Sequence, residues 1–293
     1  IDGDLLTAEE GSAADFELLY DFIRTKDLRD AMSFDYVKSR IDIGNYIDYF
    51  IMETYFGNRD WPRNNVRMWK SQRADSKWRW LLFDLDGCIP PVDHRSFSFR
   101  SDSTGTQAVI FNKLVENEEF REAFINRYEH HFQTTFSPIN IASVLIDFQN
   151  IYAQEMEGHI ERWNNPKTME DWENACRVFQ DFIVERPCSM REQLANEFNL
   201  AASFWEDCSL MNTSFGIDAY PNPSTGAFTI RIDNPVVLNG TISVTDIQGR
   251  TLYSRKLDNL LQTIDLKHVR NGIYFLRFQK DDLSRTAKMI ILN

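Results

Sequence analysis

The chain has 293 residues, of which 43% are hydrophobic, 26% charged and 13% aromatic. This composition is that of a folded protein and excludes disorder, collagen and a coiled coil, while the length predicts two domains or one large one. No apolar run approaches the ~20 residues that a membrane-spanning helix needs. The net charge of −12 disfavours nucleic acid as a partner, because phosphate binding relies on an excess of Lys and Arg.

Charge and composition differ between two parts of the chain. Residues 218–293 hold 10 Lys and Arg against 7 Asp and Glu, a net charge of +3, whereas the residues before them carry −15. All seven Trp and all four Cys lie in the first part. We therefore expect two domains, at 1–215 and 218–293. The first residue is Ile and no signal peptide follows it, so we expect the chain to be the C-terminal portion of a longer protein.

The first part begins with three predicted helices. Apolar residues at helical spacing predict a short amphipathic helix over 13–24, and a second helix is expected over 34–41. The stretch 43–56 is apolar on more than one face, which predicts a helix buried in the core.

A polar loop, 57–65, precedes two short runs rich in aromatic residues, 66–70 and 77–83, which predict a β-hairpin. The second run leads directly into Asp84-Leu85-Asp86-Gly87. Helical patterns follow over 112–131, 139–164 and 169–199, with Pro138, Pro166 and Pro187 expected to mark ends or breaks.

The last part of the chain, residues 218–293, has a different sequence pattern. Short β-type runs, separated by turn residues and too close for crossover helices, predict an antiparallel β-sandwich with about six strands. These runs are 228–232, 240–244, 251–257, 263–265, 273–279 and 286–292.

One ordered set of polar residues could carry chemistry. Asp60 and Asn65 follow the buried helix at the Asp-x4-Asn spacing of a kinase catalytic loop, and Asp84 follows the hairpin as the metal-binding Asp of a kinase does. Such an Asp can orient a hydroxyl and accept its proton, while the Asn and the second Asp converge on Mg²⁺. Asp86 is expected on the same side of an extended segment as Asp84. The alternative is a polar loop whose Asn and Asp residues serve only as turn formers.

The stretches GNRDWPRNNVRMWK and KWRWLLFDLDG resemble the spore-coat protein H (CotH) kinase family, and the resemblance extends over roughly residues 15–205. It implies a mainly helical kinase-like C-lobe with Asp60 as catalytic residue, Asn64 and Asn65 at the cofactor, and Asn65, Asp84 and Asp86 at the metal. It also implies ATP with Mg²⁺ or Mn²⁺ as cofactors and a protein hydroxyl as phosphate acceptor.

The sequence departs from the ordinary protein-kinase pattern in two ways. Asn58 stands where that pattern has His, and Leu85-Asp86 stands where it has Phe-Gly. No glycine-rich phosphate loop and no partnered Lys precede Asp60. We therefore expect the nucleotide-binding N-lobe to lie outside this sequence, so that this portion alone is inactive and binds ATP poorly.

The tail resembles the type A sorting domain of the Type IX secretion system. The resemblance rests on YPNPSTGAFTI, DIQGR, NGIYFLRF and a final strand that contains Lys288, in that order. It implies an immunoglobulin-like sandwich that the secretion translocon reads, and a protein secreted from, or attached to the surface of, a Gram-negative bacterium.

The remaining candidates are weaker. His130 and His131 are adjacent on a predicted helix and point to different faces, which disfavours a shared metal. The four Cys lack C-x-x-C spacing, which disfavours zinc, and one or two disulfides with three possible connectivities remain open. The tryptophans of the hairpin could stack on a ligand, although such residues are more often core. Two functions follow: an exported atypical kinase, or a surface structural or adhesion protein that keeps the kinase-like scaffold without turnover.

Overall fold

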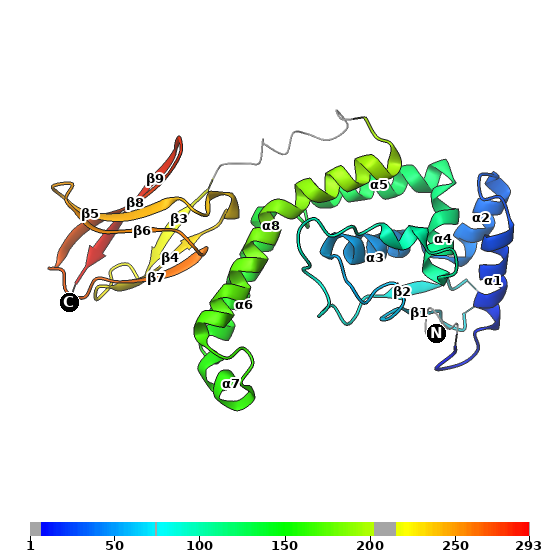
Figure 1. Ribbon diagram of the computed structural model, residues 1–293, viewed down its shortest axis with the longest axis horizontal. Coiled ribbons are helices and arrows are strands. Elements are labelled where there is room, and N and C mark those ends of the chain that lie inside the picture. The colour runs from blue at the N-terminus through cyan, green and yellow to red at the C-terminus, as the bar shows by residue number, and fades with distance from the viewer. Residues whose placement is uncertain (1–6, 74, 202–214, 293) are drawn as a thin grey trace. The chain divides into compact units, whose positions relative to one another are not determined.

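The computed structural model describes residues 7–73, 75–201 and 215–292 (Figure 1). The chain divides into two compact units. The first comprises Ile1–Gln133 with Cys188–Phe204, and the second comprises Thr134–Pro187 with Trp205–Asn293.

The first unit is mainly helical and contains one small antiparallel hairpin. Its elements are α1 (Ala14–Thr25), α2 (Ala31–Arg40), α3 (Ile43–Phe56), β1 (Arg67–Trp69), β2 (Arg79–Leu81), the 3₁₀ turn η1 (Ser98–Ser101), α4 (Thr106–Val115) and α5 (Glu118–Gln133). Helix α3 packs against β2 and α5, and α4 packs against α1, α5 and η1. The predictions of helices α1 to α3 and of the hairpin are confirmed.

Helix α3 forms the centre of this unit because its sequence is apolar on most sides. The Asp42 side chain caps its first turn by accepting the Asn45 N–H at 3.2 Å. At its centre Phe50 is fully buried and stacks on Phe111 of α4, with ring centroids 5.0 Å apart. Burying one such ring contributes about 1.5–3 kcal/mol, so α3 fixes the frame from which the following loop departs.

A side-chain amide joins the hairpin to α3. Asn45 donates to the Trp80 carbonyl at 3.2 Å and accepts the Trp80 N–H at 2.7 Å, as a neighbouring strand would. Trp78 and Trp80 are buried and serve as core residues, whereas Trp69 is 51% exposed.

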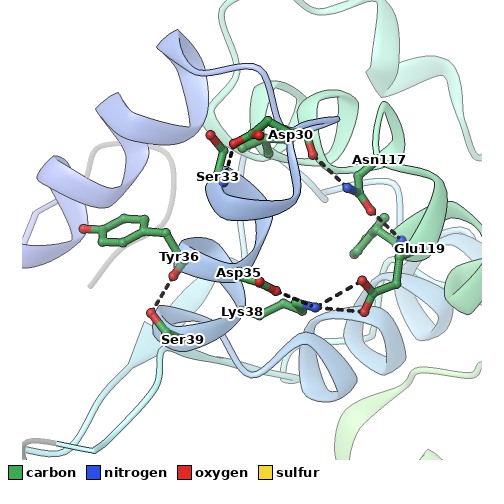
Figure 2. A network of polar contacts seen from close by, with 10 residues as sticks. Asp30, Ser33, Asp35, Tyr36, Lys38, Ser39, Asn117 and Glu119 are labelled. Carbon is green, nitrogen blue, oxygen red and sulfur yellow. Dashed lines mark hydrogen bonds and ion pairs between the residues drawn. The ribbon is translucent and has the colours of Figure 1, made fainter.

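Polar contacts connect α2 with the beginning of α5. Figure 2 shows the Lys38 ammonium between Asp35, at 2.9 Å, and Glu119, at 3.0 Å. The buried Asn117 donates to the Leu28 carbonyl at 2.7 Å. Asn117 contributes more than the exposed ion pairs, because a buried polar group without its partner is costly.

Two helical predictions need correction. The helix expected over 112–131 is two helices, α4 and α5, because Asn117 caps α5 by accepting the Phe120 N–H at 3.1 Å. The stretch expected to be one helix over 139–164 also forms two, α6 (Pro138–Ala153) and α7 (Met156–Trp163).

The expected break at Pro187 is wrong. Helix α8 (Met169–Phe198) continues through this proline, because a proline removes one backbone hydrogen bond and the bonds of the adjoining turns remain. The division between the two compact units nevertheless falls immediately after Pro187.

The C-terminal part of the second unit is an antiparallel β-sandwich, as predicted. One sheet has the order β3-β4-β7 and the other β6-β5-β8-β9. The strands are β3 (Ile217–Tyr220), β4 (Ala227–Ile232), β5 (Thr241–Asp246), β6 (Thr251–Lys256), β7 (Leu261–Asp265), β8 (Gly272–Lys280) and β9 (Leu283–Ile291), with the 3₁₀ turn η4 (Pro235–Val237) between β4 and β5. The sequence did not predict β3, a four-residue strand that ends at Tyr220, directly before Pro221.

Alternating residues of these strands fill the space between the sheets. Along β8, for example, Tyr274, Leu276 and Phe278 are buried, while Ile273 and Phe275 are exposed on the outer face. This two-residue period is the signal from which the sandwich could be predicted.

Candidate functional site

The candidate site begins where α3 ends. Gly57 ends the helix in the left-handed conformation, with φ of 62°. A Cβ atom at this position would lie 2.7 Å from Pro90 Cγ, so the close approach of the segment after the aspartates also requires glycine. The chain therefore leaves α3 in a fixed direction and enters the loop over residues 57–65, called the site loop below.

Hydrogen bonds fasten the site loop to the turn over residues 84–87. Arg59 donates its backbone N–H and its Nε–H to the Gly87 carbonyl oxygen, each at 3.3 Å. The side-chain amides of Asn58 and Asn65 both donate to the Asp84 carbonyl oxygen, at 3.4 and 3.5 Å. The structure thus brings the two sequence motifs together.

The backbone at Asp84 differs from the prediction. Strand β2 ends at Leu81, and Asp84 has a φ of 55°, so the segment is not extended and the two-residue period does not place Asp84 and Asp86 on one side. Asn65 is also left-handed, with a φ of 59°. Asn and Asp tolerate this conformation better than most residues.

The backbone of Asp60 is held on both sides. Its N–H donates to Asn58 Oδ1 at 3.2 Å, and its carbonyl accepts the Asn64 N–H at 2.9 Å. The Asp60 carboxylate lies beside Gly87, where a Cβ atom would be 3.3 Å from Asp60 Oδ2 and 2.8 Å from Asn58 Oδ1. Glycine at position 87 permits this approach.

Trp61 anchors the loop to the core. It is 7% exposed and packs edge-on against Phe50 of α3, at 5.0 Å between ring centroids, and against Phe99 of η1, at 4.8 Å. A buried aromatic side chain therefore follows directly after the exposed Asp60.

A pocket of about 490 Å³ lies beside the site loop. Asp60 and Asn64 line it, together with Glu53, Arg59, Arg63 and His94. Asn65, Asp84 and Asp86 are not among its lining residues. The predicted site residues thus divide between the pocket, which Asp60 and Asn64 line, and the adjoining turn.

The donor set suits a hard cation. The side chains of Asp84 and Asp86 are exposed, and Asn65 uses its amide nitrogen toward Asp84, which leaves its amide oxygen for another partner. Within 7–73, 75–201 and 215–292, no group of three or more His, Cys, Asp or Glu residues could hold a metal. Mg²⁺ commonly takes only one or two carboxylates together with substrate phosphates, so two aspartates and an amide fit it.

Glu53 is a residue of this site that the sequence analysis missed. It lies in the last turn of α3, it is 1% exposed, and neither carboxylate oxygen has a hydrogen-bond partner among the described residues. Burial raises its pKa to about 7, against the opposing influence of Asn58 and Tyr49. A lone glutamate in the otherwise apolar last two turns of a buried helix was the signal that could have found it.

The other candidates have structural roles. His131 Nε2 lies 3.1 Å from Asp48 Oδ1, and Arg127 binds the same carboxylate at 2.7 Å, which ties α5 to α3. Cys188 is disulfide-bonded, while Cys88 and Cys176 are free. Cys208 lies outside the described residues.

The described part of the chain contains no helix with the length and apolar character needed to cross a membrane. A search of curated proteins finds no match. Among solved structures, 27% of this chain is similar, at 19% identity and a TM-score of 0.23, to 12% of the chain of PorZ, described as an essential bacterial surface component of the type-IX secretion system of Porphyromonas gingivalis.

Two family models match the sequence. The model described as CotH kinase protein matches residues 4–190, and the model described as secretion system C-terminal sorting domain matches residues 218–292. The second match identifies an exported protein that is secreted or attached to the cell surface. Since the first match covers more than half of the sequence, the chain belongs to the CotH kinase family.

Proposed function

We propose that this protein is an exported atypical kinase, which transfers the γ-phosphate of ATP to a hydroxyl group of a protein. The observation that carries the proposal is the attachment of the site loop to the turn over 84–87 through Asn58, Arg59 and Asn65. This attachment brings the loop that contains Asp60 next to the turn that contains Asp84 and Asp86.

Asp60 is the proposed catalytic residue. Its carboxylate lines the pocket and is exposed, while its backbone is fixed by Asn58 and Asn64. A carboxylate so placed orients the attacking hydroxyl and accepts its proton as the new phosphate ester bond forms and the bond between the γ-phosphate and the ADP leaving group breaks. The buried Trp61 ring anchors the loop next to Asp60 and leaves the Asp60 carboxylate exposed.

Asn65, Asp84 and Asp86 are the residues that would hold Mg²⁺ or Mn²⁺, and Asn64 is proposed to contact the nucleotide. When bound, the cation neutralises the phosphate oxygens as charge develops on them. The chain's own contribution is to fix the turn, since two amides share the Asp84 carbonyl and leave the Asp84 carboxylate exposed to solvent.

The test is incorporation of phosphate from labelled ATP by the full-length protein. Asp60→Ala and Asp84→Ala are expected to abolish most of the labelling, whereas Asp75→Ala, at an exposed position in the hairpin turn, should label as the wild type does. Equal labelling in the wild type and all three variants would refute the catalytic roles proposed for Asp60 and Asp84. Tight binding of nucleotide and metal without transfer would favour the non-catalytic surface protein.

We further propose that the Type IX translocon recognises the sandwich over residues 218–293. Its match to a sorting domain supports this role, and the charge contrast of +3 against −15 sets it apart from the rest of the chain. Deleting residues 218–293 should leave the protein in the periplasm, as fractionation of cells would show. Undiminished delivery to the surface or medium would refute the assignment.

A further inference from the structure

Glu53 lies directly behind the site loop. Its own carbonyl oxygen accepts the N–H groups of Gly57 and Asn58, the latter at 3.1 Å, so backbone hydrogen bonds tie the start of the site loop to Glu53. Its side chain lines the pocket beside Asp60, and both carboxylate oxygens are buried without a hydrogen bond of good geometry among the described residues, although the side chains of Asn58 and Tyr49 act on them. A buried carboxyl group held so weakly needs a physical explanation.

The surroundings of Glu53 favour its neutral form. A carboxylate at the C-terminal end of a helix faces the negative end of the helix dipole, and burial adds the cost of desolvation. The side chains that act on the carboxyl group are Asn58 and Tyr49, both uncharged, and its pKa is about 7. The titratable and charged groups around it are Tyr49 on α3, Cys88 after the aspartates and, around the pocket, Arg59, Asp60, Arg63, His94 and Asp102.

Asn58 connects Glu53 to the site. Asn58 is 3% exposed, and it joins the motifs by accepting the Asp60 N–H and donating to the Asp84 carbonyl. Gly87 packs closely against the Asn58 Oδ1 atom, which restricts the other orientations of the Asn58 side chain.

The two forms of Glu53 would act on Asn58 differently. A protonated carboxyl group can donate to Asn58 Oδ1, which has a second lone pair, and both existing contacts of Asn58 then persist. A carboxylate can only accept, and it attracts an N–H of the Asn58 amide, the same group that donates to the Asp84 carbonyl over 3.4 Å.

We propose that Glu53 is a positioning residue that acts through Asn58: its neutral form holds Asn58 between Asp60 and Asp84, and its ionised form draws the Asn58 amide away from Asp84. The inference rests on the proposed phosphate transfer for its catalytic consequence. The coupling between Glu53 and Asn58 is a property of the fold and can be measured without turnover.

The catalytic test compares variants of the full-length protein between about pH 5.5 and about pH 8.5, a range that extends to both sides of the Glu53 pKa of about 7. The wild-type transfer rate is expected to decline as Glu53 ionises, whereas Glu53→Gln, a neutral mimic, should not show this decline. Glu53→Leu should be slower at every pH, by up to about 100-fold, as expected for a displaced catalytic group. Glu17→Gln, an exposed glutamate of α1, should keep the wild-type profile.

A double-mutant cycle tests whether Glu53 acts through Asn58. The double variant Glu53→Leu/Asn58→Ala should transfer phosphate no more slowly than the slower of the two single variants. The reason is that the effects of two residues do not add when one acts through the other. Multiplied losses, or an unchanged pH profile in Glu53→Gln, would overturn the proposal.

A readout without turnover separates this inference from the proposed function. The side-chain amide NMR signal of Asn58 should shift with pH near 7 in the wild type and not in Glu53→Gln. If it shifts but the wild type transfers no phosphate, the coupling stands and the kinase proposal fails. If it does not shift while transfer proceeds, the inference about Glu53 fails and the kinase proposal stands.

Discussion

At the scale of single residues, amides and backbone carbonyls hold the site together, and the carboxylates remain available. Asn58 and Asn65 both donate to the backbone oxygen of Asp84 rather than to its side chain. The carboxylates of Asp60, Asp84 and Asp86 are exposed, and none forms an ion pair within the part of the chain that the structure describes. The three carboxylates are therefore accessible from solvent on a backbone that hydrogen bonds hold in place.

Gly87 is predicted to be essential to this arrangement. Gly87→Ala places a methyl group 2.8 Å from Asn58 Oδ1 and 3.3 Å from Asp60 Oδ2, so the Asn58 side chain, which holds the Asp60 backbone, must shift. Displacement of a catalytic group by about 1 Å can cost about 100-fold in rate, and a loss of that order is expected in the phosphate-transfer assay. Gly44→Ala in α3, where the nearest atom is 3.7 Å away, is the matched control and should leave the rate unchanged. Equal rates in the two variants would show that the loop does not need glycine at position 87.

Glu53 predicts a pH dependence of stability. Its pKa is raised from 4.5 to about 7, so the folded protein binds more protons than the unfolded chain within this window, and stability falls as pH rises from about 4.5 to 7. At 1.36 kcal/mol per pKa unit the loss is about 3 kcal/mol. Denaturant unfolding followed by tryptophan fluorescence should show this decline in the wild type and a smaller one in Glu53→Gln. Parallel curves for the two proteins would contradict the burial of an ionisable group at this position.

At the scale of elements, the sequence predicts those whose pattern is repeated. Helix α3 follows from an apolar stretch, and six strands of the sandwich follow from their two-residue alternation and the turns between them. What the sequence does not predict depends on single tertiary contacts. The caps at Asn117, the left-handed turn at Asp84 and the pairing of the short β3 with β4 are set by neighbours that lie far away along the chain.

The same contrast applies to the candidate site. Asp60, Asn65 and Asp84 could be selected from spacing alone, because the hairpin between the two motifs brings its ends together. Glu53 has no such spacing signal, and only its position as a lone carboxylate in the apolar end of a helix expected to be buried could have marked it, because burial of a charged residue is rare.

A turn of the sorting domain gives an element-scale prediction. Gly226 has a φ of 90°, and a Cβ atom there would lie 2.6 Å from Lys267 Cα, beside the bond from Leu266 N–H to the Gly226 carbonyl at 2.7 Å. Gly226→Ala combines left-handed strain of about 1–2 kcal/mol with overpacking of about 1–3 kcal/mol. Hydrogen exchange should show β4 and β7 less protected in this variant.

Gly249→Ala is the matched control for that prediction. Gly249 is also left-handed, with a φ of 80°, but no atom lies within 4 Å of its Cβ position. Gly249→Ala therefore introduces the left-handed backbone strain without the overpacking, and it should lose less protection from hydrogen exchange than Gly226→Ala. Similar losses in the two variants would show that the contact with Lys267 contributes little.

At the scale of the whole molecule, the chain combines a CotH kinase family region with a C-terminal sorting domain for export. The two parts differ in net charge, in tryptophan content and in the period of their hydrophobic residues. The core of the sandwich is formed by its two sheets together with Ala142 and Ile146 of α6, whereas the site depends on α3, the site loop and the turn over 84–87. The chemistry and the sorting domain therefore depend on separate contacts, and deleting residues 218–293 should leave the site intact.

The Mg²⁺ dependence of phosphate transfer by the full-length protein tests the central claim most directly. Asp84→Ala is predicted to raise the Mg²⁺ concentration needed for half-maximal rate, because it removes a proposed cation ligand. Asp60→Ala is predicted to lower the maximal rate at saturating Mg²⁺ without changing that concentration, because it removes the group proposed to accept the proton. Wild-type rates and wild-type Mg²⁺ dependence in both variants would contradict the account.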